Sequence, residues 1–127
     1  DLRPSRLGLV ADNAERLGHD MALVAADGRL PPFRPGAFDR VLVDAPCSGL
    51  GVLRRRADAR WRTGPADVEE LADLQVDLLT AAAGLVRPGG LLFYSVCTLT
   101  SAETSGVDRR FREATGLVSG PPLGAPW

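Results

Sequence analysis

Apolar residues recur at two different spacings along this chain, and the spacing predicts where its helices and strands lie. In two segments they repeat every three or four residues, which is typical of the buried face of a helix. The clearer repeat consists of Leu71, Leu74, Leu78 and Leu85. Helices are therefore expected over residues 4–17 and 67–86, with Gly18 and Pro88-Gly89-Gly90 as stop signals, and a third helix over 103–114.

Short apolar runs between these helices predict three strands, over residues 21–25, 38–43 and 91–95. The run at 38–43 is apolar enough to be buried on both faces, as in a parallel sheet. Because helices and strands alternate, we expect an α/β fold with a parallel sheet flanked by helices. The chain opens at Asp1 directly before a helix, as if a strand had just ended, so we expect an internal fragment of a larger enzyme.

Length and composition fit one ordinary globular domain. The chain has 127 residues, of which 45% are hydrophobic and 24% charged, and a formal net charge of −1. No apolar run approaches the roughly 20 residues that a membrane span needs. The two cysteines are expected to be free thiols, which fits a reducing compartment such as the cytoplasm. With a single histidine and no cysteines at metal-binding spacing, no zinc site is expected.

Both cysteines stand directly after predicted strands, within turn-forming sequences. Cys47 lies in Asp44-Ala45-Pro46-Cys47-Ser48-Gly49, and Cys97 lies in Tyr94-Ser95-Val96-Cys97-Thr98. Open α/β sheets bind their ligands at the carboxyl ends of the strands. Two thiols at two such ends favour an enzyme with a cysteine nucleophile and a second thiol close to it. The structural alternatives are a small buried hydrophobe for Cys97 and a structural turn for Cys47.

Charged residues add two further candidate sites. Asp1, Asp27 and Asp44 stand at or just after strand ends, where carboxylates can accept hydrogen bonds from a nucleoside; the local alternatives are helix capping for Asp1 and an Asx turn for Asp27. An arginine cluster follows the first cysteine, and such clusters contact nucleic-acid phosphates or simply face solvent. Its members are Arg54, Arg55, Arg56, Arg60 and Arg62.

These motifs together resemble the Sun-type (Fmu/RsmB-like) RNA (cytosine-5) methyltransferases. Residues 44–52, with the arginine cluster and Trp61, are similar to one signature of that family. Residues 94–98, with Glu103 downstream, are similar to its second signature. Two further segments resemble those that bind S-adenosylmethionine in these enzymes: Asp1-Leu2 with Arg6-Leu7, and Ala25-Ala26-Asp27-Gly28.

The resemblance implies a fold: a partial Rossmann-like, S-adenosylmethionine-dependent methyltransferase domain over residues 1–115, with its first strand and last strands missing, followed by a flexible Pro/Gly-rich tail at 116–127. It also implies methyl transfer to carbon 5 of cytosine in RNA through a covalent cysteine adduct. The RNA is ribosomal (16S) or, as an alternative, transfer RNA.

The family pattern assigns a role to each candidate residue. Cys97 is the nucleophile, Asp44 hydrogen-bonds the cytosine near nitrogen 3, and Cys47 assists loss of the carbon-5 proton or release of the enzyme. The cofactor, S-adenosylmethionine, is bound by Asp1, Asp27 and Asp44, and the arginine cluster holds the RNA backbone.

Two rival interpretations stay open from the sequence. The first is a catalytically incomplete fragment that binds RNA or a partner without turnover. The second is a cysteine hydrolase or phosphatase, but His19 lies at the opposite end of a strand, and Arg54 is too far from Cys47 for a phosphatase loop. The target nucleotide and the oligomeric state do not follow from the sequence.

Overall fold

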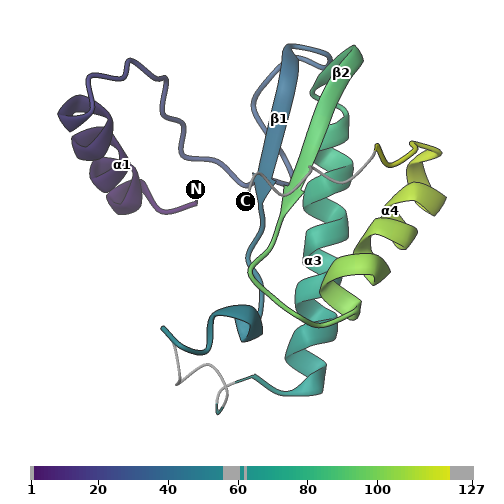
Figure 1. The fold of residues 1–127 in the computed structure, drawn as a ribbon. Helices are drawn as coiled ribbons and strands as arrows, with labels where there is room; N and C mark the ends of the chain where they lie inside the picture. Colours follow the sequence, from purple (N-terminus) through teal and green to yellow (C-terminus); the bar gives the residue numbers. More distant parts are fainter. Residues whose placement is uncertain (1, 56–60, 62, 121–127) are drawn as a thin grey trace.

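The centre of the fold is a β–α–β unit, seen in a computed structural model that describes residues 2–55, 61 and 63–120 (Figure 1). Strand β1 (Phe38–Asp44) is followed by helix α3 (Pro65–Ala83) and strand β2 (Val86–Ser95). The two strands pair in parallel, with Asp44 opposite Ser95 at their carboxyl ends. The expected α/β fold with a parallel sheet is confirmed, and the segments after the two strands start at the same edge.

Helices cover one face of this sheet (Figure 1). Helix α4 (Val107–Thr115) packs beside α3, and together they supply the buried core: Ala72, Leu79, Val107 and Phe111. Val43, Leu92 and Tyr94 of the strands pack against that core. On the opposite face Leu42 is 66% exposed, because none of the described elements covers it. The prediction that both faces of β1 are buried is therefore wrong for this chain.

The boundaries of α3 and β2 differ from the predicted ones. Helix α3 begins at Pro65, which has the fixed φ that suits a first helical position, and the carboxylate of Asp67 accepts a hydrogen bond of 2.7 Å from the Gly64 amide. The helix ends at Ala83, and Pro88-Gly89-Gly90 lies inside β2 rather than after the helix. Gly90 suits this place because a Cβ there would come within 2.7 Å of the Asp39 carbonyl oxygen.

The predicted strand at 21–25 is wrong: residues 19–27 have no regular secondary structure. A strand needs a neighbour to satisfy its backbone, and the sheet of the described residues contains β1 and β2 only. Helix α1 (Pro4–Arg16) precedes this segment and lies to one side of the sheet (Figure 1), and Ala14 is its one buried residue. Among the described residues, no helix is long and apolar enough to cross a membrane.

The third predicted helix is present but begins with a wider turn. A π-helical turn, η2 (Ala102–Gly106), runs directly into α4. The Gly106 amide donates to the Ser101 carbonyl at 2.7 Å, five residues back, which is the π pattern. Helix α4 ends at Thr115, where Gly116 adopts a left-handed conformation with φ of 70°. Single π turns inside helices are frequent at functional sites, and this one carries Glu103.

Candidate active site

The loops that follow β1 and β2 are joined to each other by backbone hydrogen bonds. The Ala45 amide donates to the Ser95 carbonyl at 3.0 Å, and the Gly51 amide donates to the Cys97 carbonyl at 3.1 Å. A Cβ on Gly51 would lie 3.0 Å from that same carbonyl oxygen, so the approach of the two loops depends on glycine at this position. We call these two segments, residues 45–51 and 96–100, the cysteine loops.

The two thiols of the cysteine loops are in contact. The Sγ atoms of Cys47 and Cys97 are 3.1 Å apart, and the Cys97 amide lies 3.3 Å from the Cys47 Sγ, to which it donates. Both are free cysteines; Cys97 is exposed and Cys47 is half-buried. The sequence prediction that the second thiol lies close to the first is confirmed.

The hydrogen bond between the thiols raises the pKa of Cys97, and burial and the nearby charges of Cys47 and Asp44 raise the pKa further. The Cys97 thiol therefore keeps its proton to a higher pH than an isolated cysteine. Only the thiolate is a strong nucleophile, so a reaction at Cys97 would require another group to take this proton.

A buried carboxylate lies beneath the cysteine loops. Oε1 of Glu103 accepts hydrogen bonds from the Ser48 amide at 2.8 Å and from Nε2 of Gln75 at 3.1 Å. Its Oε2 accepts from the hydroxyls of Ser48 at 2.6 Å, Thr98 at 2.9 Å and Thr100 at 2.8 Å. Glu103 has no exposed surface. Its carboxylate thus contacts both cysteine loops at once.

Burial raises the pKa of Glu103, but the hydrogen bonds from Ser48, Thr100 and Thr98 outweigh burial, and the net pKa lies below the usual value. The carboxylate is therefore ionised at neutral pH. Acceptor-only oxygens surrounded by donors are the arrangement that keeps a buried carboxylate charged.

Helix α3 and strand β2 complete the network around this carboxylate. Nε2 of Gln75, which is fully buried, also donates to the Pro46 carbonyl at 2.7 Å. The Tyr94 hydroxyl lies 2.8 Å from Oε1 of Gln75 and 2.7 Å from the Glu103 carbonyl oxygen. Burial raises the pKa of Tyr94, so the hydroxyl keeps its proton and acts as a donor. Each buried side-chain nitrogen or oxygen of the described residues has a hydrogen-bond partner.

The predicted aspartates lie in different surroundings. Asp44 is the last residue of β1 and is exposed at the edge from which the cysteine loops start. Asp27 is half-buried in a turn, where its carboxylate accepts hydrogen bonds from the Arg29 guanidinium, the closest at 2.7 Å, and from the Arg29 amide at 2.9 Å. These hydrogen bonds lower the pKa of Asp27. The Asx turn that was the local alternative for Asp27 is present, and Asp1 lies outside the described residues.

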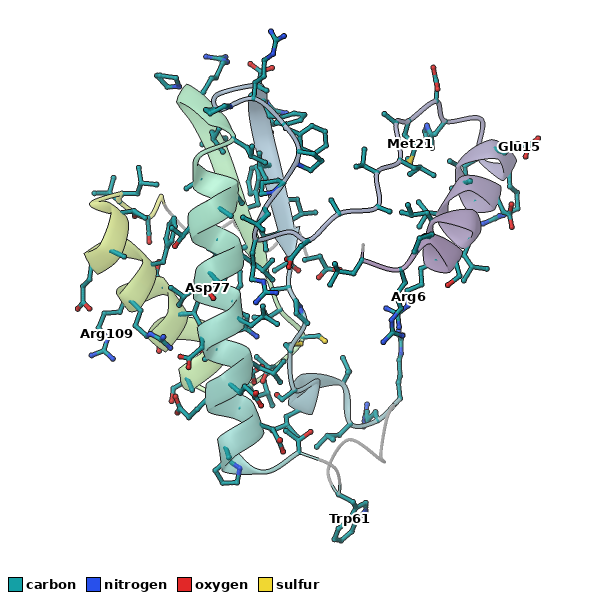
Figure 2. The ribbon with its side chains drawn as sticks, turned by 180° about the vertical axis from the view of Figure 1, so that it is seen from behind. Arg6, Glu15, Met21, Trp61, Asp77 and Arg109 are labelled. Atoms are coloured by element: carbon teal, nitrogen blue, oxygen red, sulfur yellow. The ribbon has the colours of Figure 1, made fainter. Side chains whose placement is uncertain are left out.

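The arginine cluster is described only in part. Arg54 and Arg55 are exposed and follow the short helix η1 (Leu50–Val52) of the first cysteine loop. Arg56, Arg60 and Arg62 lie outside the described residues. Trp61 is 84% exposed and projects away from the sheet (Figure 2). The first cysteine loop therefore leads directly into basic surface.

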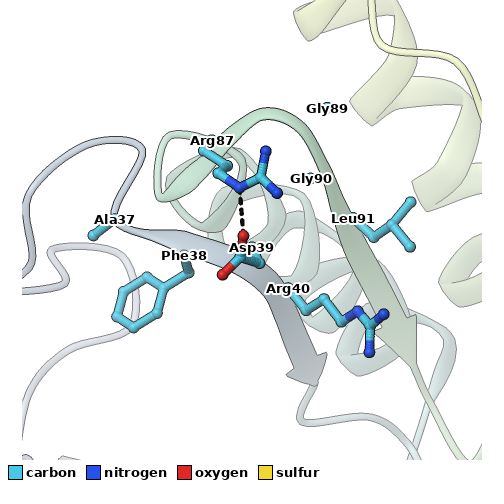
Figure 3. A pocket seen from close by; sticks show the side chains of 8 residues that line it. All are labelled: Ala37, Phe38, Asp39, Arg40, Arg87, Gly89, Gly90 and Leu91. Atoms are coloured by element: carbon cyan, nitrogen blue, oxygen red, sulfur yellow. Dashed lines mark hydrogen bonds and ion pairs between the residues drawn. The ribbon is translucent and has the colours of Figure 1, made fainter.

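Hollows lie at both ends of the strands in the part of the chain that the structure describes. One is apolar and borders the second cysteine loop, with Leu42, Phe93 and Val96 in its lining. The other lies at the opposite end of the strands, where Arg87 pairs with Asp39 beside Arg40 (Figure 3). Its charged side chains are exposed, and the Asp39 carboxylate is already paired with Arg87. Within the described residues no three His, Cys, Asp or Glu side chains are placed to hold a metal ion.

The chain is similar, over most of its length, to proteins that are named as methyltransferases. Rv1407 of Mycobacterium tuberculosis, named as a methyltransferase, is 55% identical over 103 residues, which are 81% of this chain and 22% of that protein. The ribosomal RNA small subunit methyltransferase B of Klebsiella pneumoniae is 43% identical over 107 residues, which are 83% of this chain and 25% of that protein.

A solved structure shares the fold. The crystal structure of PH0851 matches with a TM-score of 0.92 and 31% identity, covering 100% of this chain and 29% of that one. The chain thus spans only 22% to 29% of the length of these three relatives. Residues 1–118 match the sequence model of the family described as 16S rRNA methyltransferase RsmB/F, and the chain therefore belongs to that family.

Proposed function

We propose that the protein carrying this chain transfers a methyl group to carbon 5 of cytosine in RNA, and that Cys97 forms a transient covalent bond to the base. The observation that carries the proposal is the 3.1 Å contact between the Cys47 and Cys97 sulfurs at the ends of adjacent parallel strands. Membership of the RsmB/F family supports an RNA substrate, with 16S ribosomal RNA expected and transfer RNA as the alternative. Residues 1–115 then form part of the catalytic domain.

The reaction needs a nucleophile because carbon 5 of cytosine is itself a poor one. Addition of the Cys97 thiolate to carbon 6 forms an S–C bond and moves the ring electrons to carbon 5, which can then attack an electrophilic methyl group. As the new C–C bond forms, the bond between the methyl group and its donor sulfur would break, and its electron pair would leave with that sulfur. A base, for which Cys47 is the candidate, then takes the carbon-5 proton; the electrons of the C–H bond restore the ring double bond, and the S–C bond breaks to expel the thiolate. The thiolate is regenerated, and one hard step is divided into easier ones.

The different exposure of the two cysteines supports their different roles, with Cys97 as the nucleophile and Cys47 in proton transfer. Cys97 is exposed, so a base that has left its stack can reach it. Cys47 is half-buried, and its sulfur is within hydrogen-bonding distance of the Cys97 sulfur, a position suited to accepting or returning a proton. Asp44, exposed at the same edge, is suited to hydrogen-bond the cytosine near nitrogen 3 and to stabilise charge on the ring.

The family implies S-adenosylmethionine as the cofactor, and the described residues fit it in chemistry. Asp44 and Asp27 offer carboxylate oxygens, which are acceptors for ribose hydroxyls and for an amino group, and Asp44 is unshielded from solvent. We assign these two residues, with Asp1, to the cofactor site. When bound, the cofactor supplies the electrophilic methyl group.

The RNA contacts are assigned to the arginine cluster. Arg54 and Arg55 are exposed directly after the first cysteine loop, so phosphates bound there would lie close to the thiols. Arg56, Arg60 and Arg62 are assigned to the same surface from the sequence alone. Phosphate contacts of this kind position an RNA without reading its bases.

The proposal is tested by product analysis with the full-length protein that carries this chain. Incubation with S-adenosylmethionine and unmodified 16S ribosomal RNA or transfer RNA, followed by nucleoside mass spectrometry, should show 5-methylcytidine. Cys97→Ala should abolish the product while RNA binding persists. Methylation at another atom, or RNA binding without methylation by the unaltered protein, would reject the proposal; the second result would favour a binding module.

A further inference from the structure

We propose that Glu103 is the positioning residue of the cysteine pair: its buried carboxylate holds the two cysteine loops together so that the Cys47 and Cys97 thiols stay in contact. The role that this gives Glu103 in methyl transfer rests on the proposed function. The positioning itself can be measured without any methyl transfer. Glu103 does not touch either sulfur in this account and acts through the residues next to them.

The contacts of Glu103 are divided between the two cysteine loops. Ser48, the neighbour of Cys47, donates both its amide, at 2.8 Å, and its hydroxyl, at 2.6 Å, to the carboxylate. Thr98, the neighbour of Cys97, donates its hydroxyl at 2.9 Å. Ser48 and Thr98 are also 2.9 Å apart through their hydroxyl oxygens. One carboxylate therefore fixes the residue beside each thiol.

The charge of the group matters as well as its shape. Five donors converge on two oxygens, and two of them, the Ser48 amide and the Gln75 side-chain amide, cannot reverse their direction. Hydrogen bonds to an ionised acceptor are roughly twice as strong as neutral ones. An amide at position 103 would keep one acceptor oxygen, lose the charge, and turn its NH₂ group toward hydroxyls that now have to accept.

The π-helical turn places Glu103 at this point. Its i to i+5 hydrogen bond, from the Gly106 amide to the Ser101 carbonyl, widens the helix just where Glu103 meets the loops. A Cβ at Gly106 would lie 2.9 Å from the Ser101 carbonyl oxygen, so this turn depends on glycine. The turn is anchored further by the Thr104 hydroxyl, which donates to the Thr100 carbonyl at 2.7 Å.

Disulfide formation reports how well the two thiols are held in position to react with each other. Glutathione disulfide oxidises the pair: an S–S bond forms between Cys47 and Cys97, two protons are released to the two departing glutathione sulfurs, and one glutathione disulfide is reduced to two glutathione molecules. The equilibrium constant of this exchange gives the effective concentration of one thiol at the other. Because it involves neither RNA nor S-adenosylmethionine, its outcome is independent of the proposed function.

The test compares Glu103→Gln with Glu113→Gln in the full-length protein. Glu113 is exposed on α4, so this control makes the same chemical change outside the network. Glu103→Gln should lower the effective thiol concentration by about tenfold or more. It should lower kcat for methyl transfer by a similar factor and leave KM for RNA within about twofold, because the lost interaction orients the thiols rather than binding substrate. Glu113→Gln should change none of these values.

An unchanged effective thiol concentration in folded Glu103→Gln would overturn the proposal, whatever happens to activity. If Glu103→Gln does not fold, Ser48→Ala and Thr98→Val each remove a donor from one loop and are expected to lower the effective concentration in the same way; no change in either would equally overturn it. The unaltered protein could form no 5-methylcytidine while Glu103→Gln still lowers the effective thiol concentration. In that case the proposed function fails and the positioning role of Glu103 stands.

Discussion

Ser48 is bound to Glu103 through both its backbone amide, at 2.8 Å, and its hydroxyl, at 2.6 Å, across 55 residues of sequence. This double contact fixes the residue next to Cys47 to the helix that follows Cys97. Both partners are buried, so water does not compete for these hydrogen bonds. The geometry of the thiol pair is therefore set by polar contacts beneath the cysteine loops as well as by the strands that precede them.

The reactivity of Cys97 should depend on Cys47. The hydrogen bond with Cys47 raises the pKa of Cys97, so replacing Cys47 should lower that pKa and increase the thiolate fraction at a given pH. In Cys47→Ala, alkylation of Cys97 by iodoacetamide should reach its half-maximal rate at a lower pH than in the unaltered protein. Peptide mass spectrometry at a series of pH values measures this. A profile shifted to higher pH would show that Cys47 activates Cys97 in the resting protein.

Acid stability should depend on Glu103. Its folded pKa is lower than the ordinary 4.5, so its ionised form contributes stability that is fully present above that pH and is lost as the pH falls through the folded pKa. The difference in Tm between the unaltered protein and Glu103→Gln should be constant from about pH 7 to about pH 5 and shrink at lower pH. A difference that grows on acidification would mean that the carboxyl is protonated in the folded protein.

Cofactor affinity should depend on the carboxylate of Asp27. Asp27→Asn should raise the Kd for S-adenosylmethionine by about tenfold, because a charged acceptor for the nucleoside is lost. Arg29→Gln is the matched control, since it removes the guanidinium partner and keeps the carboxylate. Calorimetry on the full-length protein should find Arg29→Gln within about threefold of the unaltered Kd. If both substitutions weaken S-adenosylmethionine binding equally, Asp27 only stabilises its turn and does not contact the cofactor.

RNA affinity and its dependence on salt concentration should both depend on the arginine cluster. Replacing Arg54 and Arg55 with Gln should weaken binding to different RNA sequences alike and lower the salt dependence of log K by about 0.7 for each lost phosphate contact. The control pair, Arg34→Gln with Arg109→Gln, changes two exposed arginines elsewhere; Arg109 lies on α4 (Figure 2). A loss of turnover with unchanged affinity and unchanged salt dependence would show that Arg54 and Arg55 support the loop instead.

The sequence predicted the two strands that carry the site, because each combines an apolar run with a turn-forming end at Asp44 or Ser95. The predictions failed where contacts between distant segments decide the structure. Residues 21–25 have the composition of a strand but no strand beside them, and residues 86–90 have the composition of a turn but form the first half of β2. The predicted burial of both faces of β1 failed for the same reason, because local composition shows neither which strands pair nor what covers a sheet.

The contact between the cysteines followed from topology alone, since adjacent parallel strands end at one edge. The hydrogen-bond network of Glu103 could not be predicted from topology, because it joins residues from both cysteine loops and from α3. Two signals were available: Glu103 itself, which belongs to the second family signature, and the hydroxyl-bearing residues Ser48, Thr98 and Thr100, each beside or near a cysteine. Hydroxyl groups at such positions indicate a buried acceptor only once the two loops are known to meet.

The covalent role of Cys97 is tested most directly by trapping the bond between the protein and its base. In RNA that contains 5-fluorocytosine, carbon 5 carries fluorine in place of the proton that must leave, so the adduct persists after methyl transfer. With the full-length protein and S-adenosylmethionine, peptide mapping should locate the bond on Cys97. Cys47→Ala should also form the adduct, and with unmodified RNA it should accumulate it because turnover is impaired, whereas Cys97→Ala should form none. A Cys97→Ala protein that still crosslinks to the RNA and methylates it would contradict the account.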